Sequence, residues 1–339
     1  MSGTPRVYKF AISFFFLATC MFFIEVNKAI VSKKAGMLLS TIRFTQPQTQ
    51  FPVRRAPKPL KLCPKALAAT DFAFVSMLTD HFHVYGKGAA KLGYTLKRHS
   101  NLDLIMLEVR SKPIPSDTLN LLHRAGWQIC SVDVIHGPSH VASDTNRFLQ
   151  AYVYSKFHAW QLTEYAGIVL LDLDMLATKD PSDIFTAQLP LMRAANKSIG
   201  AVHDHPLHQC YGMGPWNSFN AGMLLIVPSN AIYTRLVNSI DRLRHNSAFD
   251  AEQALINAFF KGAFFEMPVR YNANTVIKAC EPAMWLEHRD DFRLVHYTVS
   301  KPWTYSIAWN SPQDPFACWF WRVEEYCMLW DMIDEYDGL

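Results

Sequence analysis

The stretch Gly167-Ile-Val-Leu-Leu-Asp172-Leu-Asp174 decides the fold. Its apolar part predicts a buried central strand, and that strand stops at two carboxylates. Because side chains alternate along an extended chain, Asp172 and Asp174 point to the same side, where burying them unpaired is costly. Mg²⁺ or Mn²⁺ prefers carboxylate oxygens and keeps positions for phosphate oxygens, so the pair predicts a metal site that can hold a diphosphate. The alternative is two solvated turn aspartates, because so short a motif also arises by chance.

Strand-like and helix-like segments alternate before this stretch. A short apolar run opens at Phe72, so the globular part is expected to begin near Asp71. Helical patterns follow at 88–99, 115–125 and 148–165, and strand patterns follow at 102–109 and 127–134. The alternation predicts an α/β fold with a Rossmann-like, mostly parallel sheet that helices cover on both faces. In such sheets ligands bind beyond the carboxyl ends of the strands, where the two aspartates stand.

Composition and charge limit the class of protein. The chain has 339 residues, of which 50% are hydrophobic and 18% are charged, so it can bury a large core and lacks the signature of disorder. This length fits one large domain plus a tail. The formal net charge of +4 gives nucleic-acid binding little support, whereas a small phosphate-bearing ligand fits it well.

The chain is expected to contain a short N-terminal tail (1–9), a membrane segment (10–24), a proline-containing stem (25–70), a globular domain (71–312) and a C-terminal aromatic helix (313–339). The uncharged run FAISFFFLATCMFFI at 10–24 is short for a spanning helix. It fits a signal-anchor or a cleavable signal peptide, and the lack of a small-residue cleavage pattern after it favours the anchor. The aromatic helix is expected to pack on the domain, with membrane or acceptor contact as the alternative.

The cysteines bear on the cellular compartment. Of the seven, six lie outside the membrane segment and could pair in an oxidising lumen, although nothing fixes which ones pair. The alternative is a set of scattered core thiols, and the absence of a C-x-x-C spacing argues against structural zinc. Asn196-Lys-Ser198 is a glycosylation sequon that the same compartment would allow to be used.

A third metal ligand is expected at His296, which follows an apolar run. Neutral imidazole suits Mn²⁺ better than Mg²⁺. Lys301, a short distance further along the chain, would place a cation beside the metal and so complete a phosphate site. The alternative for His296 is an ordinary surface or core histidine.

The order of these motifs resembles glycosyltransferase family 8, the family of glycogenin, galactinol synthase and the plant xylan glucuronyltransferases. The similarity spans nearly the whole globular part, and its most specific string is Tyr154-Ser-Lys-Phe-His-Ala-Trp-Gln-Leu-Thr-Glu-Tyr165. The resemblance implies that Lys156 contacts the donor sugar or its phosphates, against the alternative of a solvated lysine. It also implies a nucleoside role for Thr79, Asp80 and His83, with His83 at the place of a stacking tyrosine.

The second half of the domain carries the matches that concern the sugar. Phe219-Asn-Ala-Gly222 is similar to the family's F-N-S-G strand, which implies that Asn220 and Ala221 contact the donor sugar. Ala221 has no hydroxyl to offer the sugar where the family has serine, so donor specificity is expected to differ. Glu252 and Gln253 fill the place of the family's D-Q pair, so Glu252 is the candidate acid near the anomeric carbon. The alternative for both residues is capping of a helix at 254–260.

Two further matches concern the acceptor side and the last ligand loop. Met267-Pro-Val-Arg-Tyr-Asn272 resembles the family's P-x-x-Y-N, which shapes the acceptor side. The loop from His296 to Lys301 is one residue shorter than in glycogenin-like enzymes and lacks their glycine, so its backbone is expected to approach the diphosphate differently.

The resemblance implies one GT-A type nucleotide-diphospho-sugar transferase domain. It implies a metal-dependent, retaining transferase that moves a hexosyl or uronosyl group from a UDP-sugar to a glycan, polyol or protein, with Mn²⁺ or Mg²⁺ as cofactor. Together with the membrane segment, it favours a single-pass type II protein of the Golgi or ER membrane with a lumenal catalytic domain. The alternatives are an inactive nucleotide-sugar-binding scaffold on the same fold, and a phosphatase or nuclease metal site at the aspartate pair.

Overall fold

The computed structural model describes residues 70–79, 82–138, 152–204, 218–242, 251–298 and 301, all within the unit Pro52–Leu339. The expected tail (1–9), membrane segment (10–24), C-terminal helix (313–339) and all but the last residue of the stem (25–70) lie outside these ranges. Within the described ranges, no helix is both long and apolar enough to cross a membrane.

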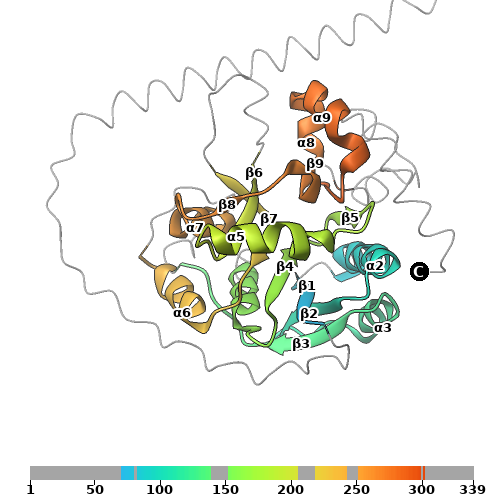
Figure 1. Ribbon diagram of the computed structural model, residues 1–339. Helices are drawn as coiled ribbons and strands as arrows, with labels where there is room; N and C mark the ends of the chain where they lie inside the picture. The colour runs from blue at the N-terminus through green and yellow to red at the C-terminus, as the bar shows by residue number, and fades with distance from the viewer. Residues whose placement is uncertain are drawn as a thin grey trace, which may run out of the picture. The chain divides into compact units, whose positions relative to one another are not determined.

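A seven-stranded sheet lies at the centre of the described residues, in the order β3-β2-β1-β4-β7-β6-β8 (Figure 1). Its strands are β1 (Phe72–Leu78), β2 (Asp103–Val109), β3 (Gln128–Val132), β4 (Gly167–Leu171), β6 (Ile199–His203), β7 (Phe219–Ile226) and β8 (Phe265–Glu266). β1 pairs in parallel with β2 and β4, and β7 runs antiparallel to its neighbours β4 and β6. The predicted mostly parallel sheet is therefore confirmed, with β7 as the reversed strand.

The strand order reverses at β1. The chain runs outward from β1 through β2 to β3 and then returns to place β4 on the other side of β1. Such a switch point leaves a crevice at the carboxyl ends of the two strands, which is where α/β sheets bind ligands. Thr79 follows β1 and Asp172 follows β4 directly, so both residues stand at this crevice.

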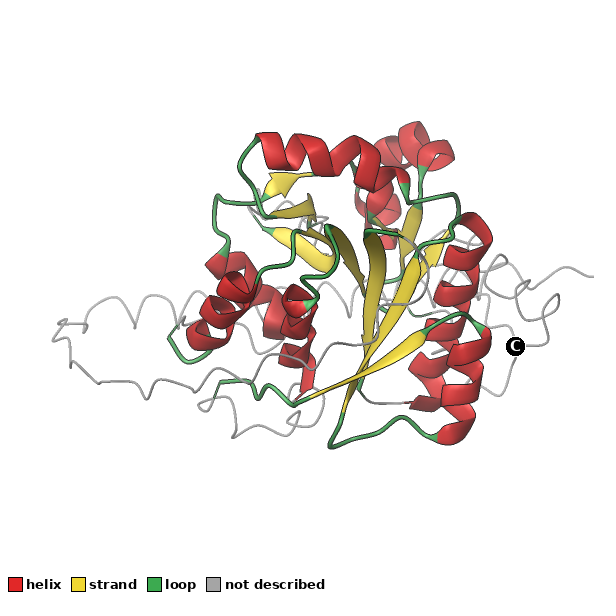
Figure 2. Cartoon of the chain, turned by 60° about the horizontal axis from the view of Figure 1, so that its bottom comes forward, coloured by secondary structure: helices red, strands yellow, loops and turns green. Residues whose placement is uncertain are grey.

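Helices cover both faces of the sheet, as Figure 2 shows. Successive strand residues point to opposite faces, and in β1 Val75 and Phe74 accordingly belong to two different hydrophobic clusters. The face of Val75 is covered by η2 (Tyr154–Gln161), α6 (Asn230–Ser239) and α7 (Ala251–Phe259). The face of Phe74 is covered by α2 (Phe82–His99), α3 (Ser116–Arg124), η3 (Ile184–Gln188) and α5 (Leu189–Ala194).

The stretch expected as a helix over 148–165 contains the 3-10 helix η2 in its described part. Tyr154, Phe157 and Trp160 recur every third residue and are all buried, which matches the three residues per turn of a 3-10 helix. Their rings pack edge to face, with centroid distances of 5.8 and 6.2 Å. This packing fixes the turn that carries Lys156.

A second, three-stranded sheet, in the order β5-β10-β9, brings the C-terminal part of the domain back to the end of β4. The elements of this region are β5 (Met175–Ala177), η5 (Val269–Tyr271), β9 (Ala273–Asn274), α8 (Thr275–Cys280), α9 (Pro282–His288), η6 (Arg289–Asp291) and β10 (Leu294–His296). β10 pairs antiparallel with β5, and His296 is the partner of Met175. This pairing holds His296 beside Asp172 and Asp174, although it lies far from them in the sequence.

Candidate active site

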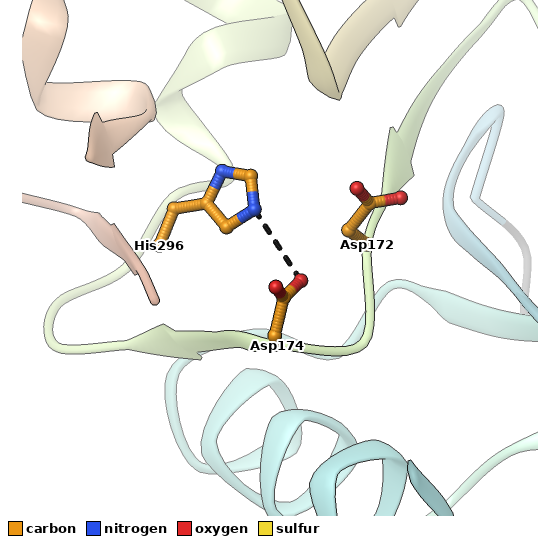
Figure 3. Close-up of side chains that lie close together, drawn as sticks. All are labelled: Asp172, Asp174 and His296. Carbon is orange, nitrogen blue, oxygen red and sulfur yellow. Dashed lines mark ion pairs between the residues drawn. The ribbon is translucent and has the colours of Figure 1, made fainter. Parts of the chain in front are cut away.

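Asp172, Asp174 and His296 form a cluster in which one ligand atom from each lies within 4.8 Å of the others. Figure 3 shows His296 and Asp174 facing each other, with Asp172 beside them. His296 Nε2 is 3.3 Å from Asp174 Oδ1. The side chains of Asp174 and His296 are 8% and 3% exposed, while that of Asp172 is 30% exposed. The three predicted metal ligands are therefore brought together by the fold.

Backbone contacts set the positions of these ligands. The N–H of Asp172 donates to the carbonyl of Gly222 at 2.8 Å, and the N–H of Tyr297 donates to the carbonyl of Asp174 at 2.9 Å. A Cβ on Gly222 would lie 2.2 Å from His296 Cε1, well inside contact distance. The glycine of the F-N-A-G stretch is thus the residue that lets His296 pack against β7.

Lys156 links the cluster to the predicted acid. Its Nζ lies 2.6 Å from Asp172 Oδ1 and 2.7 Å from Glu252 Oε1, and its side chain is only 13% exposed. Burial works against the charge on Lys156, but Asp172 and Glu252 hold its pKa above the usual value. The described geometry excludes the solvated-lysine alternative, and it joins residues 96 positions apart in sequence.

Lys301 pairs with Asp174 as Lys156 pairs with Asp172. Its Nζ forms an ion pair with Asp174 and donates to the carbonyls of Tyr297 at 2.9 Å and Thr298 at 2.6 Å. Burial opposes the charge on Asp174, but Lys301 and His296 lower the pKa of this carboxyl well below its usual range. The shorter loop before Lys301 therefore still delivers the lysine to the cluster.

The charges of the site are nearly balanced without a metal. Asp172, Asp174 and Glu252 supply three carboxylates, and Lys156 and Lys301 supply two ammonium groups. A bound divalent cation would leave this group with a net positive charge when His296 is neutral. The donor set of two carboxylates and one imidazole fits such a cation, and the resulting charge suits a diphosphate.

A cavity of about 340 Å³ opens at the switch point of the sheet. It is lined by Met77, Leu78, Thr79, Tyr85, Val153, Lys156, Asp172, Leu173, Asp174 and Lys301. Thr79, for which the family resemblance implies a nucleoside role, thus lines this cavity. Asp80 is outside the described residues, and His83 belongs to α2 but its side chain is not described.

Tyr85 is the aromatic side chain of this cavity that sequence reasoning missed. It lies two residues after His83, on the first turn of α2. Burial raises the pKa of its hydroxyl, so the ring stays neutral at ordinary pH. The signal that could have found it is the position of a tyrosine at the start of the helix that follows the first strand.

Glu252 and Gln253 occupy the first turn of α7, but their side chains bind outside the helix. Glu252 pairs with Lys156, while Gln253 accepts from the N–H of Ala221 at 2.8 Å and donates to Asp204 at 3.1 Å. These contacts do not support the alternative of simple helix capping. Ala221 and Gln253 lie behind the cluster and are not among the residues that line the cavity.

Sequence interpretation missed Asp204 and the contact that Asn272 makes with His296. Asp204 follows β6 as Asp172 follows β4, and it accepts hydrogen bonds from Asn220 at 3.1 Å and from Gln253 at 3.1 Å. Asn272, expected on the acceptor side, is 1% exposed and hydrogen-bonds His296 Nδ1 at 2.9 Å. The rule that ligands bind just beyond the ends of strands located Asp172 and would also have located Asp204. For Asn272, no local sequence pattern predicts the contact with His296.

Comparisons with known proteins place the chain among sugar transferases. A family model for glycosyl transferase family 8 matches residues 78–306. Glycogenin-1 of Mus musculus is 27% identical over 247 residues, which cover 70% of this chain and 67% of the relative. Galactinol synthase 1 of Solanum lycopersicum is 25% identical over 253 residues, which cover 69% of this chain and 74% of the relative.

A solved structure resembles the same part of the chain. The apo form of the bifunctional glycosyltransferase WbbM matches with a TM-score of 0.53 and 16% sequence identity, and the match covers 70% of this chain and 48% of WbbM. At this level of identity the likeness concerns the fold.

Proposed function

Because the chain belongs to glycosyl transferase family 8 and is a glycosyltransferase with the GT-A fold, we propose that it moves a hexosyl or uronosyl group from a UDP-sugar to a glycan, polyol or protein acceptor. The observation that carries this proposal is the cluster of Asp172, Asp174 and His296, whose aspartates line the cavity at the switch point. A phosphatase or nuclease interpretation of the aspartate pair finds no support in the family.

Asp172, Asp174 and His296 are the residues that would hold a divalent cation. The imidazole favours Mn²⁺ over Mg²⁺. The ion would supply positive charge to the diphosphate of the donor. Lys156 and Lys301 now neutralise the two aspartates. With a cation held by the aspartates, these ammonium groups would be available to bind phosphate oxygens of the donor.

The nucleoside would occupy the wall of the cavity formed by the end of β1 and the start of α2. Tyr85 offers a ring for stacking on uracil, and Thr79 offers a hydroxyl at the strand end. His83 and Asp80 keep the nucleoside role that the family resemblance implies for them. The described residues of this wall are uncharged, as expected for a surface that binds a flat neutral base.

Glu252 would stand beside the donor sugar, because it is ion-paired to Lys156, which lines the cavity and also contacts Asp172. During transfer the bond between the anomeric carbon and the diphosphate oxygen breaks, and the acceptor oxygen bonds to the same face of that carbon. The acceptor proton leaves on the released diphosphate. The carboxylate of Glu252 would stabilise the positive charge that develops on the sugar ring. Asn220, Ala221 and Gln253 would shape the sugar pocket from behind.

A secretory location belongs to the same proposal. The apolar run at 10–24 supplies a signal-anchor for a type II protein of the Golgi or ER membrane with its catalytic domain in the lumen. Cys130 and Cys280 each take part in a disulfide bond, which supports an oxidising compartment.

Nucleotide binding and turnover test the proposal together. Asp172→Ala and Asp174→Ala should each weaken Mn²⁺-dependent UDP binding by more than about 100-fold. Removing a metal ligand should lower the affinity more than removing a residue that only supports a ligand. Calorimetric titration of UDP with Mn²⁺ measures this effect. Asp290→Ala is the matched control, since the Asp290 side chain is 97% exposed. Unchanged affinity in both cluster variants would remove the metal assignment.

Transfer itself is tested by offering purified protein a set of UDP-sugars with Mn²⁺ and measuring released UDP with and without candidate acceptors. Release that rises with one acceptor identifies a transferase and its substrates. Bound nucleotide with no release from any sugar would instead support the inactive scaffold.

A further inference from the structure

Behind the metal cluster, four side chains from separate elements form one line of hydrogen bonds. His296 Nδ1 lies 2.9 Å from Asn272 Oδ1, and Asn272 Nδ2 donates to Asn220 Oδ1 at 3.0 Å. Asn220 Nδ2 in turn donates to Asp204 Oδ1 at 3.1 Å. The four residues are between 1% and 9% exposed, so their polar atoms depend on one another.

The direction of every bond in this line is fixed. The N–H of Gly222 can only donate, and it reaches Asn220 Oδ1 at 3.0 Å, while a carboxylate such as that of Asp204 accepts. Asn220 is therefore held in one amide orientation from two sides. Its oxygen then faces the amide nitrogen of Asn272, which turns the oxygen of Asn272 toward the histidine ring.

The consequence reaches the metal ligand. Because Asn272 presents an oxygen, His296 Nδ1 must carry a hydrogen to donate to it. In the neutral ring the lone pair then lies on Nε2, which faces Asp174 Oδ1 at 3.3 Å. These two atoms are both acceptors, so they offer a cation two donor atoms at one place. In the opposite tautomer the lone pair of Nδ1 would face the oxygen of Asn272, so two acceptors would be in contact. Its Nε2–H would also occupy the position where a metal would bind.

We propose that Asn272 is a positioning residue that holds His296 in its Nδ1–H tautomer, so that Nε2 is ready to bind a divalent cation. Asn220 and Asp204 hold Asn272 in the orientation that this requires. Partners of this kind commonly orient a ligating histidine and raise its basicity. The proposal rests on the metal-binding role of the cluster, but the tautomer itself is a property of the protein without metal.

A pair of variants separates tautomer control from packing. Asn272→Leu keeps the approximate size of the side chain and removes the acceptor for Nδ1–H. Asn272→Asp keeps an acceptor there and removes the donor to Asn220. Both variants lose the bond to Asn220, so both should melt at a lower temperature. Only Asn272→Leu should allow the ring of His296 to adopt both neutral tautomers.

The first measurement is ¹⁵N NMR of the histidine rings in the full-length, metal-free protein at alkaline pH, where imidazole is neutral. The signal of His296 is identified by its loss in His296→Gln. We expect Nδ1–H in the wild type and in Asn272→Asp, and a mixture of tautomers in Asn272→Leu. Asn274→Ala is the control, because Asn274 is also buried and caps α8 without a hydrogen bond to the ring.

The second measurement is Mn²⁺ affinity by titration. Asn272→Leu should bind Mn²⁺ about 10- to 100-fold more weakly, and Asn272→Asp should stay within about threefold of the wild type. Should Asn272→Leu fail to fold, Asn272→Ala makes the same comparison. An Nε2–H tautomer in the wild type, or equal losses of affinity in the Leu and Asp variants, would overturn the proposal. A correct tautomer with no Mn²⁺ binding in any variant would instead count against the metal-dependent function.

Discussion

The two walls of the cavity hold their side chains in different ways. On the wall formed by the end of β1 and the start of α2, Met77, Leu78 and Tyr85 offer apolar surface and one ring. On the wall formed by Lys156, the residues after β4 and Lys301, every charged side chain is tied to another by an ion pair. The first wall suits binding by shape and stacking, and this kind of binding tolerates small substitutions. The second wall suits binding and catalysis by charged groups, and these depend on every member of the ion pairs.

The charged wall should show the largest effects, and Glu252→Gln isolates the chemical step. Glutamine keeps the size of the side chain and an oxygen for Lys156, now 2.7 Å from the carboxylate, but it removes the negative charge near the sugar. We expect kcat to fall about 10²- to 10⁴-fold while the affinity for UDP-sugar changes little. Steady-state kinetics with the best donor measures both quantities.

Glu266→Gln is the control for this change, because the Glu266 side chain is 68% exposed and pairs only loosely with His203 at 3.4 Å. Unaltered turnover in Glu252→Gln would refute the role given to this carboxylate and would leave it a partner of Lys156 alone.

Close packing behind the charged wall predicts the next effect. In Gly222→Ala the new Cβ would meet the ring of His296 at 2.2 Å, so the histidine must move away from the aspartates. Mn²⁺ affinity should fall about 10- to 100-fold. Gly200→Ala is the matched control, since its Cβ would meet the end of a flexible side chain, Met267 Sδ, at 2.7 Å. Equal affinities in the two variants would show that the ring has room to shift without losing its ligand role.

The sequence predicted the parts of the site that follow from local pattern. A five-residue apolar strand ending in Asp-x-Asp locates the aspartates, and alternation predicts the sheet and its covered faces. Asp204 and the contact of Asn272 with His296 were not predicted, because they depend on segments that lie far apart in the chain. The same holds for the pairing of Lys156 with Glu252, which the family resemblance named separately.

The first wall should give smaller effects, and it offers two candidate rings. Tyr85→Ala should cost about 1–3 kcal/mol of UDP affinity because the stacking ring is removed, and Tyr85→Phe should bind UDP nearly as the wild type does. Calorimetric titration of UDP with Mn²⁺ measures both. The same titration of His83→Ala decides between the ring that lines the cavity and the ring that the family resemblance singled out. A larger loss in His83→Ala than in Tyr85→Ala would move the nucleoside contact to His83.

The smallest effect is expected outside both walls, at the sequon Asn196-Lys-Ser198. Asn196 is exposed and has φ of 53°, a left-handed turn conformation that asparagine tolerates well. In a lumenal domain it should carry a glycan, seen as a mobility shift on glycosidase treatment of the protein made in secretory cells. Asn196→Gln and Ser198→Ala should both abolish the shift and leave transfer within about twofold of the wild type, as surface changes usually do. Only Asn196→Gln should also lower the melting temperature, because glutamine fits the left-handed turn less well, so the pair separates the loss of the glycan from the strain of the turn. No shift in the wild type would argue against glycosylation at this turn without touching either wall of the cavity.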